Sequence, residues 1–175
     1  MIKFKSYKNI LIVCGDIGGA EIISSFVIEK KIKFKSYFSK KASLIFKKKK
    51  IKNKIINYEN IRKNPYKFDL LITGTGWDSK YDREALYIFR NIEIKKISFL
   101  DHWANYKTKF YYKGLNSYPS DIITSDKYSY NIAKKTFQNF DIKIHKIKNY
   151  FISQTKANYK TKNKKFINSN SFLFI

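Results

Sequence analysis

Residues 10–27 read ILIVCGDIGGAEIISSFV, and this stretch decides the fold class. Residues 10–13 form a continuous apolar run, which is typical of a strand buried on both faces of a parallel sheet. Gly15, Gly18 and Gly19 follow, and apolar residues then resume at helical spacing. Glycine permits a sharp turn and close approach of a ligand, and the first N–H groups of a helix attract anions. The stretch therefore predicts a strand, a glycine-rich loop and a helix, as in nucleotide-binding or sugar-binding α/β domains.

Further apolar runs repeat this strand-then-helix pattern along the chain. Strands are predicted at residues 34–38, 54–57, 68–73, 96–100, 121–124 and 142–147. Amphipathic helical spacing lies between several of them, and the strands at 68–73 and 96–100 are separated by close to the roughly 30 residues of a βαβ unit. Alternating strands and helices predict an α/β fold with a mostly parallel sheet of six or seven strands.

The helix predicted after residues 74–77 has an apolar face and a polar face. Ala85 and Ile88 lie on the apolar face, whereas Asp82 and Glu84 are expected on the other face, toward solvent.

The chain is strongly basic, with 37 lysines and arginines against 13 acidic residues and a formal net charge of +24. Only Arg62, Arg83 and Arg90 are arginines, whereas recognition of nucleic acid depends heavily on the forked arginine side chain. The sequence is also rich in Ile, Asn, Tyr and Phe, so AT-rich codon usage accounts for the excess of lysine. The composition disfavours nucleic acid as a partner and leaves open a weak contact with an anionic membrane surface.

Cys14 is the single cysteine, which excludes an intramolecular disulfide and a multi-cysteine zinc site, and with two histidines in the chain no metal site is expected. The first apolar run ends at Gly15 and is shorter than the roughly 7–15 apolar residues of a signal-peptide core. No run approaches the roughly 20 apolar residues of a membrane-spanning helix. These features predict a cytoplasmic protein.

Polar residues follow the predicted strands where each one ends. Asp16 follows the first strand, the segment 74–77 follows a second, and Asp101, His102 and Trp103 follow a third. Parallel sheets bind ligands at the carboxyl ends of their strands, so these residues are expected at one edge. His102 could serve as a general acid or base, with its ring oriented by a neighbouring carboxylate.

Two further acidic residues have a simpler explanation. Asp78 and Asp126 each precede a predicted helix, where an aspartate commonly accepts hydrogen bonds from unpaired N–H groups. We therefore expect Asp126 to cap its helix, and either Asp78 or Ser79 to cap the helix after residues 74–77.

The glycine loop does not match the two common phosphate-binding patterns. Ile17 replaces the second glycine of the dinucleotide fingerprint G-x-G-x-x-G, and Ala20 takes its last position. No lysine follows Gly18 or Gly19, so the loop is also not a P-loop. An NAD enzyme and a P-loop nucleotide hydrolase are both disfavoured.

Four segments in combination resemble a known superfamily. They are GDIGGAE at residues 15–21, KASLIF at 41–46, DLLITGTGW at 69–77 and SFLDHW at 98–103. Together they resemble the N-terminal half of GT-B glycosyltransferases and of the related UDP-N-acetylglucosamine 2-epimerases, over about residues 8–153. Ala20 and Glu21 depart from the pattern, because some relatives carry a histidine after the paired glycines.

The resemblance implies a Rossmann-like, three-layer α/β/α domain that faces a second such domain across a cleft. In that superfamily the N-terminal domain mostly meets the sugar acceptor, and the C-terminal domain holds the nucleotide-sugar donor. Carried over, Asp16, Glu21 and His102 would lie nearest the chemistry. The residues implied to contact the substrate are Gly15, Gly18, Gly19, Gly74, Thr75, Gly76, Trp77, Asp101 and Trp103.

The end of the chain is expected to lie outside this domain. Residues 154–165 are rich in Lys, Asn and Thr and predict a linker, and FLFI at residues 172–175 predicts the first, incomplete strand of a missing second domain. The domain would thus span residues 1–153, with 154–175 beyond it. This half would bind no cofactor itself; a complete relative would use a nucleotide-sugar, and a separate C-terminal half is a possible partner.

The leading hypothesis is therefore the acceptor-side half of a hexosyltransferase-like or epimerase-like enzyme of surface-polysaccharide or glycoconjugate synthesis, inactive without a donor-binding half. Its ligand would be a sugar acceptor or a sugar nucleotide. One alternative is a stand-alone binding module for a nucleotide or a phosphorylated metabolite. Another is a basic protein that binds nucleic acid or a membrane surface.

Overall fold

A computed structural model describes residues 2, 4–77 and 79–162 of the chain. Its main sheet has seven strands, all paired in parallel, in the order β3-β2-β1-β4-β5-β8-β9. The strands are β1 (Ile10–Cys14), β2 (Lys35–Phe38), β3 (Lys54–Ile55), β4 (Leu70–Thr73), β5 (Lys95–Phe99), β8 (Asp121–Thr124) and β9 (Lys143–Lys146). Together with alternating helices, this order makes the fold a Rossmann-like α/β fold.

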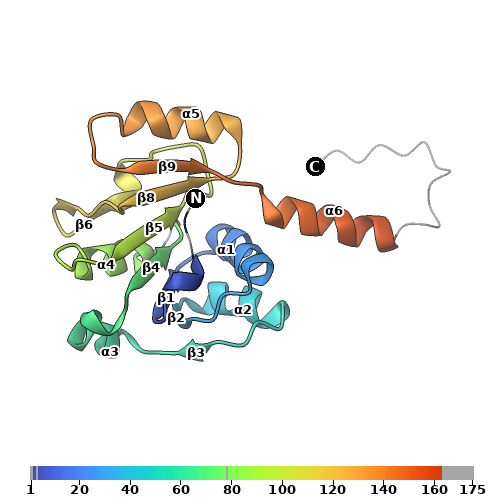
Figure 1. Ribbon diagram of the computed structural model, residues 1–175, viewed down its shortest axis with the longest axis horizontal. Coiled ribbons are helices and arrows are strands. Elements are labelled where there is room, and N and C mark those ends of the chain that lie inside the picture. The colour runs from blue at the N-terminus through green and yellow to red at the C-terminus, as the bar shows by residue number, and fades with distance from the viewer. Residues whose placement is uncertain (1, 3, 78, 163–175) are drawn as a thin grey trace.

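The helices are α1 (Ile17–Lys30), α2 (Lys40–Lys48), α3 (Tyr58–Lys63), α4 (Tyr81–Ile88), α5 (Lys127–Thr136) and α6 (Tyr150–Lys162). Short 3-10 helices lie at η1 (Phe4–Ser6), η2 (Pro65–Lys67) and η3 (Thr108–Phe110). The long connection between β5 and β8 also contains a small antiparallel pair, β6 (Tyr111–Tyr112) and β7 (Leu115–Asn116). Figure 1 labels the six α-helices and most of the strands.

The predicted parallel sheet is confirmed, and each predicted strand has a counterpart whose ends differ by at most two residues. The strand pair β6 and β7 was not predicted, because its two-residue strands are too short to show a periodic pattern.

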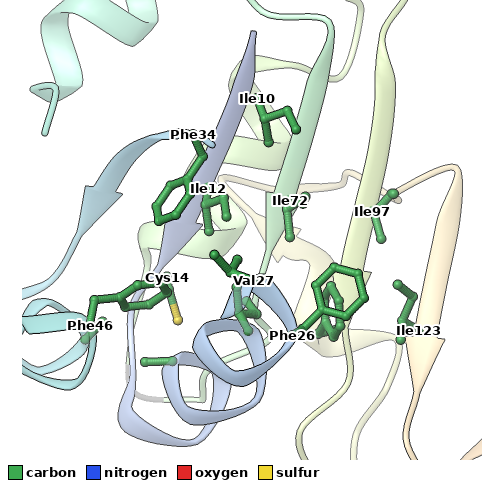
Figure 2. Close-up of a cluster of buried hydrophobic side chains, with 14 of the residues drawn as sticks. Ile10, Ile12, Cys14, Phe26, Val27, Phe34, Phe46, Ile72, Ile97 and Ile123 are labelled. Carbon is green, nitrogen blue, oxygen red and sulfur yellow. The ribbon is translucent and has the colours of Figure 1, made fainter. Parts of the chain in front are cut away.

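Each face of the sheet is covered by helices, and β1 shows why. Its side chains alternate, so that Ile10, Ile12 and Cys14 join one core and Leu11 and Val13 join the other. The first core includes buried residues of α1 and α2, and the second includes buried residues of α3, α4 and α5. Figure 2 shows the first core, in which Phe26 and Val27 of α1 pack on isoleucines from the strands. A run that is apolar at every position is thus required by a strand with two buried faces.

The linker predicted at residues 154–165 is wrong for residues 154–162, which form part of α6. Residues 163–165 lie outside the described residues. Asn149 caps α6, its Oδ1 accepting a hydrogen bond from the Ile152 N–H at 3.0 Å. The helix is anchored on α1, where Gln154 Nε2 donates to the Ser25 carbonyl at 3.2 Å. The predicted incomplete strand at residues 172–175 lies outside the described residues and stays a prediction.

Within the described part of the chain, no helix is both long enough and apolar enough to cross a membrane.

Candidate functional site

The loops that follow β1, β4 and β5 meet at the carboxyl edge of the sheet, because these three strands are neighbours. After β1 the chain enters α1 on one face, and after β4 it enters α4 on the opposite face. Ligands of doubly wound sheets bind at such a reversal, in the crevice beyond the strand ends. The sequence-predicted residues at 15–19, 74–77 and 101–103 follow these three strands.

Asp16 occupies the N-terminus of α1. Its Oδ1 accepts a hydrogen bond from the Gly19 N–H at 2.9 Å, so the carboxylate already fills the position where an anion would bind. A methyl group added to Gly76 would lie 2.5 Å from Asp16 Oδ2, which is closer than real contacts allow. Glycine at position 76 therefore lets the loop after β4 approach the Asp16 carboxylate.

Asp101 lies next to this loop and joins it to a buried lysine. Its Oδ1 accepts hydrogen bonds from the Thr75 hydroxyl at 2.8 Å and from Lys109 Nζ at 3.1 Å. Lys109, in η3, is 5% exposed and also donates to the Thr75 carbonyl at 2.9 Å. The Lys109 ammonium is thus paired inside the site and fixes Thr75 and Asp101 relative to each other.

Asp82 is a central residue of the site, and the sequence prediction for it was wrong. It was expected on the solvent face of α4 but is 1% exposed. Its Oδ2 accepts from the Gly15 N–H at 3.2 Å and its Oδ1 from the Gly74 N–H at 3.0 Å. One carboxyl group therefore bridges the loops after β1 and β4 at the reversal of the sheet.

The surroundings of Asp82 strongly perturb its acidity. Burial, followed by repulsion from the Asp16 carboxylate, raises the pKa of Asp82 to about 7, although the two backbone N–H groups act in the opposite direction. Burial and the Asp82 and Asp16 charges also raise the pKa of the Cys14 thiol well above its ordinary value. Cys14 therefore stays a neutral thiol and is a poor nucleophile.

Glu84 was also predicted to face solvent, and that prediction was wrong as well. It is 6% exposed, and its Oε1 accepts a hydrogen bond from the Tyr112 hydroxyl at 3.0 Å. The unpredicted β6–β7 hairpin covers this side of α4.

Glu21 is directed toward α2, unlike Asp16. It forms an ion pair with Lys49 at 2.6 Å, and Lys49 also donates to the hydroxyl groups of Ser24 and Ser25. These contacts place the Glu21 carboxylate in the packing of α1 against α2.

The aromatic residues predicted at the site are exposed beside it. Trp77 is 61% exposed and Trp103 is 57% exposed. Trp103 Nε1 donates to Asp126 Oδ2 at 3.4 Å, and its ring centroid lies 6.0 Å from that of His102. His102 is exposed, so the structure does not bring its ring into the buried group of Asp82, Asp101 and Lys109.

The two predicted helix caps have different outcomes. Asp126 caps α5 as predicted, its Oδ1 accepting from the Ser129 N–H at 2.7 Å. Asp78 lies outside the described residues, and α4 begins after Lys80 without a side-chain cap.

An open pocket of about 500 Å³ lies over the loop after β1. It is lined by Gly15, Asp16, Ile17, Gly18, Ser39, Lys41, Ser79, Lys80 and Tyr81. Ser39 holds the loop after β1 against the start of α2 at the base of this pocket. Its hydroxyl donates to the Gly15 carbonyl at 2.6 Å and accepts from the Ala42 N–H at 3.1 Å. Among the described residues, no group of three or more His, Cys, Asp or Glu side chains is arranged to hold a metal ion.

Sequence reasoning missed Asp82, Lys109 and Ser39 as residues of the site, and it considered Ser79 only as a helix cap. The spacing of Asp82 within α4 gave no signal, because an acidic residue in the first turn of a helix is usually solvated or compensates the helix dipole. Ser39 could have been found, since it directly follows a predicted strand and precedes a helix.

Comparisons of this chain with models of protein families, with curated proteins and with solved structures give no match. The fold and the geometry of the strand-end loops are therefore the basis for a functional assignment.

Proposed function

We propose that this chain is the acceptor-side half of a GT-B-like glycosyltransferase or related sugar-nucleotide enzyme, acting in surface-polysaccharide or glycoconjugate synthesis. The observation that carries the proposal is the pocket of about 500 Å³ over the loop after β1, beside the group of Asp16, Asp82 and Asp101. The four sequence segments that resemble the superfamily also include the three loops at this edge.

The Asp16 carboxylate favours a polyhydroxylated ligand over a phosphate at the loop after β1. Carboxylates accept hydrogen bonds from sugar hydroxyl groups, and bonds to an ionised acceptor are stronger than those between neutral groups. A phosphate at the N-terminus of α1 would instead meet the Asp16 carboxylate, which already accepts the Gly19 N–H. The loop after β1 thus supports recognition of a neutral sugar acceptor.

One observation favours a second candidate, a binding module for a phosphorylated metabolite. Lys41 and Lys80 line the same pocket as Asp16, and two ammonium groups could offset the repulsion between that carboxylate and a phosphate. The two candidates therefore differ in how the Asp16 charge affects binding.

Ligand titrations of the full chain test the proposal. Trp77 and Trp103 are the two tryptophans of the chain and are exposed beside the site, so their fluorescence can report binding. We expect neutral oligosaccharides to change this fluorescence and UDP-sugars to bind only weakly, because the donor is assigned to another domain. Tight UDP-sugar binding by this chain would contradict the assignment.

The variant Asp16→Asn distinguishes the two candidates by the sign of its effect. Asparagine caps a helix about as well as aspartate, so the fold is retained while the charge is removed. A sugar that uses the carboxylate should bind roughly tenfold more weakly, because a hydrogen bond to a charged group contributes about 1.5–3 kcal/mol and the neutral bond that asparagine still accepts contributes about 0.5–1.5 kcal/mol. A phosphorylated ligand should bind more tightly.

Asp141→Asn is the matched control, because it makes the same change of charge at an exposed position between α5 and β9. It should leave both affinities unchanged.

A further inference from the structure

A second, larger pocket lies away from the carboxyl-edge loops, and we call it the β9 groove. Its volume is about 790 Å³, within the roughly 300–1,000 Å³ range of small-molecule sites. Ile2 and Phe4 of the N-terminal segment line it, together with Phe26 and Lys30 of α1, Tyr130 of α5 and residues of β8, β9 and the segment up to Tyr150. Figure 1 shows that α6 extends away from the sheet after the end of β9.

The β9 groove has an apolar floor and a basic rim. Phe4, Ile147 and Tyr150 form part of the floor and are half-buried, so some of their apolar surface is open. Lys30, Lys146 and Lys148 line the groove and are exposed. Among the described residues that line the groove, none is acidic. This combination fits a ligand with a long apolar part and a negatively charged end.

His145 adds a polar group of fixed orientation to the groove. Its Nε2 lies 2.6 Å from Asp121 Oδ1, and the Asp121 side chain is 1% exposed and also pairs with Lys95. Burial alone would raise the pKa of the Asp121 carboxyl, but hydrogen bonds from Lys95 and His145 outweigh burial and lower it. Asp121 therefore stays ionised and holds the imidazole ring, whose other nitrogen, Nδ1, can donate to an anion when the ring is protonated.

We infer that the β9 groove binds a long-chain fatty acid anion. The hydrocarbon chain lies along Phe4, Ile147 and Tyr150, where it buries apolar surface that the fold leaves open. The carboxylate lies beside His145 at the basic rim, which Lys30 and Lys148 also line. Lys146 follows His145 in β9, so its side chain points to the other face of the strand and adds charge from a greater distance. This site is separate from the proposed acceptor site and does not depend on that assignment.

A fluorescent fatty acid tests the inference on the full chain. Parinaric acid, kept below its micelle concentration, should bind saturably with one site per chain, and palmitate should displace it. Hexadecyltrimethylammonium, which has a similar chain and the opposite charge, should not displace it. The ring signals of His145 should shift in NMR spectra during the titration, while those of His102, the other histidine of the chain, should not.

Paired charge reversals separate this groove from the general basic charge of the chain. Lys146→Glu with Lys148→Glu should raise the dissociation constant at least about tenfold, which corresponds to about 1.4 kcal/mol. Lys52→Glu with Lys54→Glu makes the same change of charge at and beside β3, on the opposite edge of the sheet, and should leave the affinity nearly unchanged. All four lysines are exposed, so both variants should fold, which circular dichroism can verify.

Three results would overturn the inference. Equal weakening by both lysine pairs would show general attraction of anions to a basic protein. Binding that appears only after removal of residues 163–175 would show that the chain's own end occupies the groove. A concentration-dependent dimer that the reversals at Lys146 and Lys148 abolish, without fatty-acid binding, would assign the groove to a second copy of the chain.

Discussion

At the scale of single residues, the Asp82 carboxyl makes stability depend on pH. Its pKa is about 7 in the folded chain and roughly 3.9 in an unfolded one. Between these values the folded state retains a proton that the unfolded state releases, so the free energy of unfolding falls as pH rises. This contribution is at most about 1.4 kcal/mol per pH unit and levels off above pH 7.

The variant Asp82→Asn removes this titration. Urea unfolding at several pH values between 4.5 and 7.5 should show the stability advantage of the natural chain over the variant shrinking as pH rises. At low pH the variant should be less stable by about 1–3 kcal/mol, because one asparagine oxygen cannot serve both the Gly15 and Gly74 N–H groups. Asp141→Asn, at an exposed position, should show no such trend.

A constant difference between Asp82→Asn and the natural chain across this pH range would contradict a raised pKa for Asp82. The hydrogen bonds from the Gly15 and Gly74 N–H groups would then lower the pKa of Asp82 by as much as burial raises it.

Single residues also mark the limit of what the sequence predicts at the site. The glycines and Asp16, Thr75 and Asp101 were predicted because they directly follow apolar runs, which places them at strand ends. Asp82 and Lys109 could not be predicted, because their burial depends on partners elsewhere in the chain. Asp82 pairs with Gly15, 67 positions away, and Lys109 pairs with Asp101, 8 positions away. Hydrophobic spacing identifies the apolar face of α4, but it does not reveal a polar residue buried through pairing.

At the scale of elements, the turn after β1 depends on the close fit between Gly15 and the segment before α4. A Cβ atom added at Gly15 would lie 1.8 Å from Ser79 Oγ and 2.3 Å from Ser79 Cβ. Gly15→Ala should therefore destabilise the fold by about 1–3 kcal/mol, as over-packing usually does. Urea unfolding at a fixed pH would measure this loss.

Adding Ser79→Gly to Gly15→Ala tests whether contact with Ser79 causes the loss of stability, because it removes both atoms that the new methyl group would meet. The double variant should recover part of the stability lost in Gly15→Ala, and the interaction energy of the double-mutant cycle should exceed about 0.5 kcal/mol. Additive effects of the two substitutions would mean that the loop after β1 relaxes away from Ser79.

Helix α6 shows why a polar composition can mislead. Residues 154–162 contain few large apolar side chains, so the sequence predicted a linker, yet these residues continue a helix that starts at Tyr150. The helix is stabilised by contacts with distant residues, including the Tyr150 ring, whose centroid lies 6.2 Å from that of Phe26. The Asn149 cap was the local signal that could have indicated it.

At the scale of the whole molecule, the alternation of apolar runs predicted the parallel sheet, but the strand order required the structure. A buried strand has the same apolar pattern in any central position of a sheet, so the pattern cannot show that β1 pairs with both β2 and β4. That pairing places the reversal of the sheet between β1 and β4, where Asp82 joins the two loops.

The net charge of +24 predicts that salt stabilises the whole fold. Folding brings many lysines closer together, and their repulsion destabilises the compact state. The screening length falls from about 30 Å at 0.01 M salt to about 3 Å at 1 M, so added NaCl should weaken this repulsion. The midpoint of urea unfolding should therefore rise with NaCl concentration, and urea, being uncharged, does not itself screen.

The double variant Lys52→Glu and Lys54→Glu tests whether repulsion is the cause. Each substitution lowers the net charge by two, and neither lysine takes part in the ion pairs found among the described residues. The salt-dependent rise of the midpoint should be smaller in this variant than in the natural chain. A midpoint that instead falls with salt would show that ion pairs such as Lys49 with Glu21 outweigh the repulsion between lysines.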